Sequence, residues 1–125
     1  MIEYKIDPAQ HLIRVRMSGV NKPADLLRHV ADLSADPQFD PTFHALFRIT
    51  EDASMQIMLF DSLLKTILEQ WQQRRKGVKW AVVASSQIQL GLAKLATDNV
   101  NFRFVQLRFF NDEDSALKWF SSGGR

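Results

Sequence analysis

Three histidines are the residues of this sequence best suited to acid–base or metal chemistry. They are His11, His29 and His44. No two of them have the HxH, HxxxH or HExxH spacing that sets two metal ligands on one face of an element. Isolated histidines usually serve as polar residues at or near the surface, and we expect His29 on the exposed side of a helix. The sequence therefore predicts no metal site and no cofactor.

The carboxylates and glycines give no sign of catalysis either. Glu51, Asp52 and the acidic residues 112–114 lie at expected helix starts, where negative charge offsets the helix dipole. The five glycines are scattered, and the chain lacks a nucleophile elbow, a Walker loop and a dinucleotide-binding fingerprint. The absence of cysteine excludes a disulfide scaffold, a cysteine-type zinc site and a thiol nucleophile. We therefore expect a non-enzymatic protein without catalytic residues.

One cluster of cations lies close to aromatic residues. Residues 74–76 and Lys79 are basic, and Trp71 and Trp80 flank them, a pattern found in nucleic-acid-binding proteins. The cations also follow the end of an expected helix, where they match its dipole, and the tryptophans fall at apolar-periodic positions typical of a core. With 16 Lys and Arg against 14 Asp and Glu, the net charge of +2 is small. We expect no nucleic-acid partner.

The sequence also bears on the location of the protein. Its apolar stretches are far shorter than the roughly twenty residues of a membrane-spanning helix. The amino terminus has an acidic residue at position 3 and no apolar segment, unlike a signal peptide. We therefore expect a cytoplasmic protein with no transmembrane segment.

Apolar periodicity predicts the elements of the first half. Residues 2–6 and 12–17 alternate in polarity around the turn Asp7-Pro8-Ala9-Gln10 and favour a β-hairpin. Pro23 suits the first turn of a helix that continues to Leu33, and residues 43–49 then form a strand with apolar residues on both faces.

The second half alternates between helices and strands. We expect a long helix over 52–76, a buried strand over 78–84 and a last strand over 102–110 before a short final helix. Ser86 and Gln89 form a capping-box pattern, which opens a helix whose inward residues are predicted to be Ile88, Leu92, Leu95 and Ala96. The order ββαβαβαβα predicts one α/β domain over residues 1–120, with a mostly parallel (mixed) five-stranded sheet, flanking helices and a flexible tail at 121–125.

The start of the long helix departs from an amphipathic pattern. Five of six residues are apolar: Met55, Ile57, Met58, Leu59 and Phe60. Residues at 100° steps cannot all face one sheet, so part of this turn faces a loop, a second subunit or a hydrophobic ligand. Methionines suit an adaptable contact surface, and a wide buried face under neighbouring loops explains the pattern equally well. The segment follows a strand at the carboxyl edge of the sheet, the usual binding edge of open parallel sheets.

Five strings in order resemble the SpoIIAA-like family of bacterial proteins, which is related to the STAS domains (sulfate transporter and anti-sigma factor antagonist). They are IRVRMSG, LSADPQFDP, WQQRRKG, VKWAVVAS and RFFNDEDSALKWF, and they span nearly the whole chain. The resemblance implies a small α/β domain that acts by docking to a protein, often as a homodimer.

In phosphorylated STAS proteins a partner kinase reads a serine in an Asp-Ser-Ser-Gly-type motif. Ser54 lies near the matching place, but Ala53 precedes it, and Met55 or Gln56 stands where the motif has glycine. We expect Ser54 to be a plain capping or first-turn residue rather than a phosphorylated one.

Three hypotheses follow. The first is a cytoplasmic interaction or regulatory domain that docks to a protein partner or to itself through the loop and apolar helix start at 50–60. The second is a carrier of a small apolar ligand or lipid, lined by Met55, Leu59 and residues of the 88–95 helix. The third is a regulator controlled by phosphorylation of Ser54. The predicted interaction or ligand surface consists of Met55, Met58, Leu59, Phe60 and Leu92.

Overall fold

The computed structural model of the protein describes residues 1–54, 62–98, 100 and 102–122. Within them, five strands form one sheet in the order β1-β2-β3-β4-β5. The antiparallel hairpin joins β1 and β2, and the other three pairings are parallel. The strands are β1 (Ile2–Asp7), β2 (Leu12–Met17), β3 (His44–Ile49), β4 (Lys79–Val83) and β5 (Gln106–Phe110).

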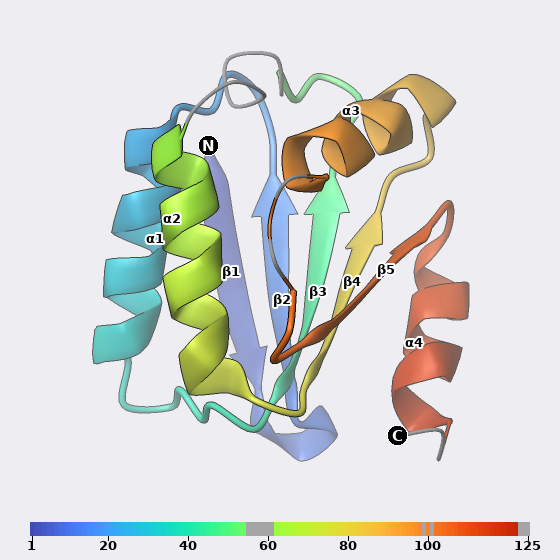
Figure 1. The fold of residues 1–125 in the computed structure, drawn as a ribbon. Coiled ribbons are helices and arrows are strands. Elements are labelled where there is room, and N and C mark those ends of the chain that lie inside the picture. The colour runs from blue at the N-terminus through green and yellow to red at the C-terminus, as the bar shows by residue number, and fades with distance from the viewer. Residues whose placement is uncertain (55–61, 99, 101, 123–125) are drawn as a thin grey trace.

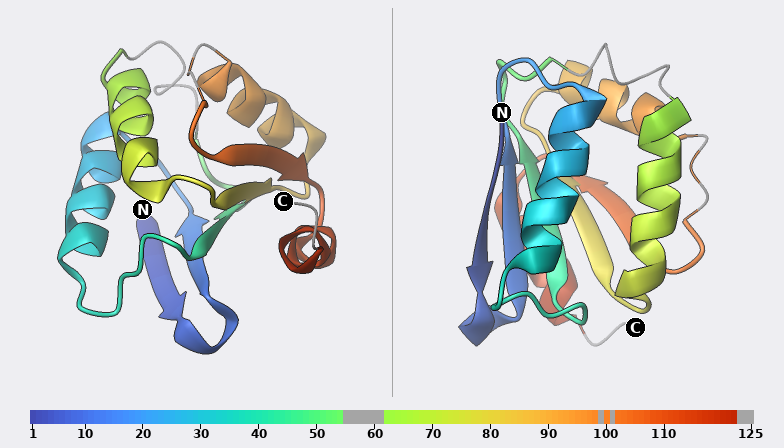
Figure 2. Two further views of the ribbon diagram at one scale, coloured as in Figure 1. Left: turned by 60° about the horizontal axis from the view of Figure 1, so that its bottom comes forward. Right: turned by 90° about the vertical axis from the view of Figure 1, so that its left-hand side faces the viewer.

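Four helices pack on this sheet. They are α1 (Pro23–Ala35), α2 (Ser62–Trp71), α3 (Gln87–Thr97) and α4 (Glu113–Ser121), and 3₁₀ turns occur at η1 (Pro8–Gln10) and η3 (Gln72–Arg75). Of the described helices, α1, α2 and α3 lie on one face and α4 lies alone on the other (Figures 1 and 2). Each parallel crossover steps in the same direction, and right-handed crossovers then place their helices on the same side. The predicted α/β class and mixed five-stranded sheet are confirmed.

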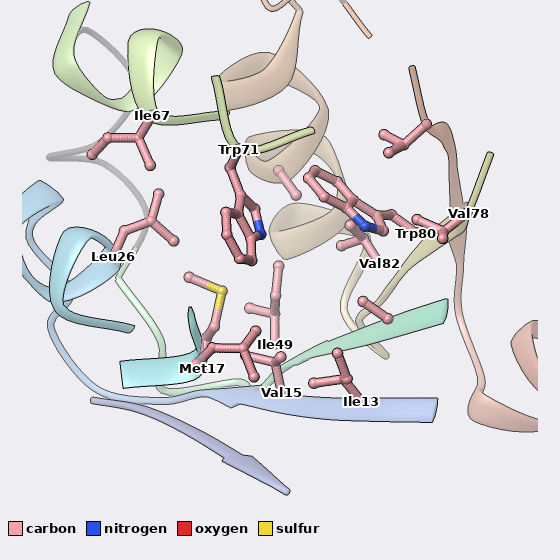
Figure 3. Packing of buried hydrophobic residues seen from close by; sticks show 14 of the residues in the cluster. Ile13, Val15, Met17, Leu26, Ile49, Ile67, Trp71, Val78, Trp80 and Val82 are labelled. Atoms are coloured by element: carbon pink, nitrogen blue, oxygen red, sulfur yellow. The ribbon is translucent and has the colours of Figure 1, made fainter. Parts of the chain in front are cut away.

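The first face carries the main core. Two tryptophans dominate it: Trp71 is 7% exposed and Trp80 is 2% exposed, which confirms their predicted place among the apolar residues. In Figure 3 the Trp71 ring lies above Met17, Val15 and Ile49 of the strands, and Trp80 extends from β4 itself. The other labelled members of this cluster are Ile13, Val15, Met17, Leu26, Ile49, Ile67, Val78 and Val82.

A second, smaller core lies under α4. Ala116 and Trp119 of α4 pack on Leu46 of β3 and on β4. At the far end of the helix the buried ammonium of Lys79 donates hydrogen bonds to the carbonyl oxygens of Trp119 (2.9 Å) and Ser122 (3.2 Å). A cation at the carboxyl end of a helix is stabilised by the helix dipole. Residues 121 and 122, expected in a flexible tail, are therefore held by the fold.

Arg75 is a cation inside the main core. It is 1% exposed, and its guanidinium donates a hydrogen bond to the Pro41 carbonyl oxygen (3.1 Å) and a second one to that of Phe43. It also lies over the rings of Phe39 and Trp80, at 5.5 and 5.9 Å from their centroids. Burial lowers the pKa of Arg75 to about 10. Arg75 thus holds the loop between α1 and β3 against η3. The sequence did not indicate this role, because Arg75 is one of three consecutive basic residues there.

Further sequence-based expectations differ from the structure. The last strand begins at Gln106 rather than at residue 102, and the long helix is described from Ser62 to Trp71, with η3 after it. The predicted start at residue 52 is wrong, because 51 and 52 form a turn and Ser54 pairs with Val20 in a parallel bridge. His29 is 6% exposed rather than on the solvent side of α1, because it packs edge-on against Tyr4 with ring centroids 5.6 Å apart.

Candidate interaction surface

Three loops meet at the carboxyl edge of the parallel strands. The backbone N–H of Ser54, after β3, donates to the Gly19 carbonyl oxygen after β2 at 2.7 Å. The loop at 50–54 also contacts the start of α3, which follows β4 at the same edge (Figure 1). Because parallel strands end at one side of a sheet, loops far apart in sequence form a continuous surface there.

Gln89 fixes the loop at 50–54 onto α3. Its side chain is 7% exposed, and the amide nitrogen donates to the carbonyl oxygens of Thr50 (3.4 Å), Glu51 (3.1 Å) and Ala53. Its backbone N–H donates to the Ser86 hydroxyl at 3.4 Å, so Ser86 caps the helix as predicted. The Gln89 amide oxygen is buried without a hydrogen-bond partner among the described residues. The sequence indicated that Ser86 caps the helix, but it gave no sign of the hydrogen bonds from the Gln89 amide to the loop.

The apolar face of α3 is reversed relative to the prediction. Ile88 is 76% exposed and Leu95 is 60% exposed, whereas Leu90 (6%) and Ala93 (3%) are buried against the sheet. Leu92 is half-buried and contacts the edge of the main core. The predicted inward orientation of Ile88 and Leu95 is therefore wrong; the side chain of Ala96 lies outside the described part of the structure. A second stripe at helical spacing consists of Gln89, Leu90 and Ala93. The hydrogen bonds from Gln89 to the loop at 50–54 turn this stripe inward.

The outward face of α3 forms an apolar strip made of Ile88, Gly91, Leu92 and Leu95. A Cβ placed on Gly91 would have no atom within 4 Å, so nothing covers the middle of the strip among the described residues. Lys94 is the sole charged residue of α3, and its ammonium lies 5.7 Å from the Phe109 ring centroid, toward β5. We call this surface the α3 strip.

The predicted surface overlaps the α3 strip at Leu92 alone. Met55, Met58, Leu59 and Phe60 lie outside the described residues, so their predicted role stays a prediction. Ser54 is described, half-buried and held by its bridge to the loop after β2. Phosphorylation of Ser54 and binding of an apolar ligand beside Leu92 stay predictions in the same way.

Two described titratable groups, Asp52 and His44, take part in structural contacts. The Thr50 hydroxyl donates to Asp52, and this hydrogen bond holds the pKa of that exposed carboxyl below its usual value. Burial lowers the pKa of His44, with the charge of Lys79 adding to the effect, and the His44 Nδ1 accepts a hydrogen bond from the Lys79 backbone N–H at 2.9 Å. Within the described ranges, no three His, Asp or Glu side chains are placed to hold a metal ion.

Comparison of the chain with known proteins found no similar protein. The chain matches no protein-family model, no curated protein and no solved structure. Among the described helices, none is long and apolar enough to cross a membrane.

Proposed function

We propose that the protein is a non-enzymatic interaction domain that pairs with a second copy of itself through the α3 strip. The observation that carries the proposal is the exposure of Ile88 and Leu95. Large apolar side chains that are clustered on one exposed helix face often mark an interaction site. Helix α1 on the same side of the sheet differs, because it carries Asp25, Arg28 and Asp32 along its length.

The α3 strip is suited to pairing with its own copy. A two-fold dimer brings one patch against the same patch of the partner. If two α3 helices cross in antiparallel fashion near Gly91 and Leu92, Ile88 of one copy meets Leu95 of the other, because these residues flank the crossing point at equal distances. Gly91 has no side chain to hold the helices apart, so their axes can approach to about 8 Å. Lys94 lies to one side, over Phe109, and need not be buried.

The size of the strip predicts a weak dimer. Burial of one Ile or Leu side chain contributes up to about 2 kcal/mol, and the strip offers two largely exposed ones per copy. Association costs at least roughly 4 kcal/mol in lost translational and rotational freedom. The four side chains of a dimer contribute at most about 8 kcal/mol, which leaves at most about 4 kcal/mol after this cost, so we expect reversible association in the millimolar range.

The family resemblance agrees with this function. The SpoIIAA-like proteins are docking domains that often form homodimers, and they are bacterial. Membership of that family, a cytoplasmic location and a regulatory role are parts of the proposal. A separate protein partner that docks on the same strip is an alternative outcome.

Sedimentation over a concentration series tests the self-association. Wild-type protein should show a rising average mass, and Ile88→Glu should abolish the rise because a carboxylate would be buried against Leu95 of the partner copy. Leu27→Glu is the matched control, since Leu27 is 49% exposed on α1, away from α3. A constant monomer mass for the wild type, or equal losses in both variants, would refute pairing through the strip.

A cysteine cross-link tests the geometry. The chain has no cysteine, so Gly91→Cys places a single thiol at the predicted crossing point. Mild oxidation should give a disulfide dimer of Gly91→Cys, whereas Leu27→Cys should stay monomeric. Dimers of both variants at equal rates would contradict an axis at Gly91.

Native mass spectrometry separates this function from the alternatives. A clean mixture of monomer and dimer supports pairing. A co-purified lipid that the Leu92→Glu variant loses would instead support a carrier with an apolar site beside α3. If bacterial kinases phosphorylate Ser54 and the dimer is then lost, phosphorylation of Ser54 would control the self-association.

A further inference from the structure

The second face of the sheet is covered by α4 over only part of its width. Ala116 and Trp119 of α4 pack on β4 and on Leu46 of β3. Leu12 at the start of β2 also belongs to the cluster under α4, whereas β1 and the later parts of β2 and β3 lie beyond this helix (Figure 2). A hollow of about 430 Å³ lies there, with the fully buried Leu46 among its lining residues.

Strand register gathers four cations around this hollow. Arg16 of β2 is paired with Arg48 of β3, and Arg14 is paired with Leu46 one row below. On the other side of β2, Lys5 of β1 is the partner of Arg14. Paired residues point to the same face of a sheet, so these side chains share the open half. The register places Arg14 and Arg16 beside Arg48 although Arg48 is far away along the chain.

The cations outnumber the carboxylates around the hollow. Arg14 forms an ion pair with Glu113 at 3.1 Å, and Arg16 forms one with Glu3 at 3.4 Å. Among the described residues, Arg48 and Lys5 form no ion pair, and both are exposed. Like charges directly opposite each other on neighbouring strands destabilise the pair. Arg16 and Arg48 are such a pair, and Glu3 is bonded to only one of them.

We propose that this hollow binds a small molecule through a doubly charged phosphate group held between Arg16 and Arg48. Neighbouring strands lie about 4.8 Å apart, so two guanidinium groups from β2 and β3 can each donate to the oxygens of one tetrahedral phosphate. Arginine forks match phosphate oxygens in this way. Arg48 and Lys5 are the two cations of the hollow that form no ion pair among the described residues, so a doubly charged phosphate balances both charges, whereas a singly charged carboxylate would balance only one.

The neighbouring charges define the class of ligand. A second hollow of about 400 Å³ shares Arg48 and Glu113 with the first and is also lined by Glu51, Asp112 and Ser85. These carboxylates would repel a phosphate, which is therefore confined to the side of Arg48 that faces β1. The rest of the ligand would extend toward acidic and hydroxyl groups, so we expect a phosphate monoester that carries hydroxyl or amino groups. The size of the first hollow suits a small molecule.

Titration of the full chain with glycerol phosphate, followed by amide and arginine side-chain NMR shifts, tests the site. The shifts should concentrate on β2, β3 and the Arg16 and Arg48 side chains, and sodium chloride at equal ionic strength should not reproduce them. Arg48→Gln should weaken binding at least tenfold. Arg28→Gln, which removes an exposed arginine from α1, is the matched control and should leave the affinity unchanged.

Two outcomes would overturn the proposal. One is a shift pattern that sodium chloride reproduces, or that both variants change equally, since the effect would then be general screening. The other is tight binding of a DNA duplex that Arg28→Gln weakens as much as Arg48→Gln, because a diffuse cationic surface would then explain the data. Folding of Arg48→Gln is checked by its NMR spectrum, and the exposed position of Arg48 makes the change tolerable. The site is independent of the α3 strip, so a wild-type protein that stays monomeric leaves this test intact.

Discussion

The buried His29 should make the stability of the protein depend on pH in the mildly acidic range. His29 is 6% exposed on α1, and its Nδ1 has no hydrogen-bond partner among the described residues. Burial lowers the pKa of His29 from 6.5 to about 4, Asp32 opposes that shift, and the charge of Arg75 adds to it. The ring of Tyr4 packs edge-on against the imidazole. The folded protein therefore holds His29 neutral where the unfolded chain would protonate it.

The sign and size of the effect follow from this difference. Between pH 6.5 and about 4 the unfolded chain binds more protons than the folded protein at His29, so the free energy of unfolding falls as the pH falls. The stabilisation is complete above pH 6.5. A difference of about 2.5 pKa units corresponds to roughly 3 kcal/mol over the full range, of which about 2 kcal/mol is lost by pH 5.

Urea unfolding at a series of pH values from about 7.5 to about 5 measures this loss, because ordinary carboxylates titrate mostly below that range. The variant His29→Gln removes the imidazole, so its free energy of unfolding should fall by roughly 2 kcal/mol less than that of the wild type between about pH 7.5 and 5, whatever its absolute stability. His44 contributes a smaller change of the same sign, because its pKa is also lowered. The control His11→Asn replaces an exposed imidazole at a residue with φ of 53°, a conformation that asparagine tolerates. A wild-type slope in His29→Gln would refute a neutral, buried His29.

Three further substitutions test the buried polar contacts. Arg75→Met should lower the free energy of unfolding by about 3 kcal/mol in urea, because the Pro41 and Phe43 carbonyls lose their donors. Lys79→Met should cost about 2 kcal/mol and speed proteolysis within α4, since the helix end loses its bound ammonium. Gln89→Leu should cost roughly 1–3 kcal/mol and speed amide hydrogen exchange at 50–54, because three carbonyls of that loop lose a donor. Unchanged unfolding in any of these variants would show that the corresponding contact contributes nothing to stability.

The order of the elements along the chain and the mixed sheet could be predicted from the sequence because they depend on local signals. Alternating polarity defines β1 and β2, the turn at Asp7 and Pro8 joins them, and strand–helix alternation implies parallel pairing. The start of the long helix could not be placed, because its apolar residues do not show where the turn at 51 and 52 ends. Turn chemistry and the bridge from Ser54 to Val20 decide the path of the chain there.

The orientation of α3 could not be read from apolar spacing alone. Ile88, Leu92 and Leu95 form a regular stripe, and the prediction turned that stripe inward. In the structure Gln89, Leu90 and Ala93 face the sheet, since the Gln89 amide has three carbonyls to bind there. Gln89, a polar residue in the buried stripe, identifies the inward face only once the loop at 50–54 is in place to accept its hydrogen bonds.

The buried charges were missed for a related reason. Arg75 is buried because carbonyl oxygens from Pro41 and Phe43, far away in sequence, accept its hydrogen bonds. Lys79 is buried because the end of α4 reaches it. A buried charge is tolerable only with such partners, and partners joined by the fold leave no local pattern. The cluster of Arg14, Arg16 and Arg48 could not be predicted for the same reason, because the register of β2 and β3 brings these residues together.

The topology explains why the open half of the sheet is polar, but it does not explain why that half is rich in arginine. Successive crossovers in one direction place α1, α2 and α3 on one face, which leaves a single helix for the other. One nine-residue helix cannot cover five strands, so the remaining strand positions must carry residues that water can solvate. Threonine, glutamate or lysine in alternation would satisfy that need without repulsion. Arg16 opposite Arg48 adds an electrostatic cost that the fold does not require, and a bound dianion would remove it.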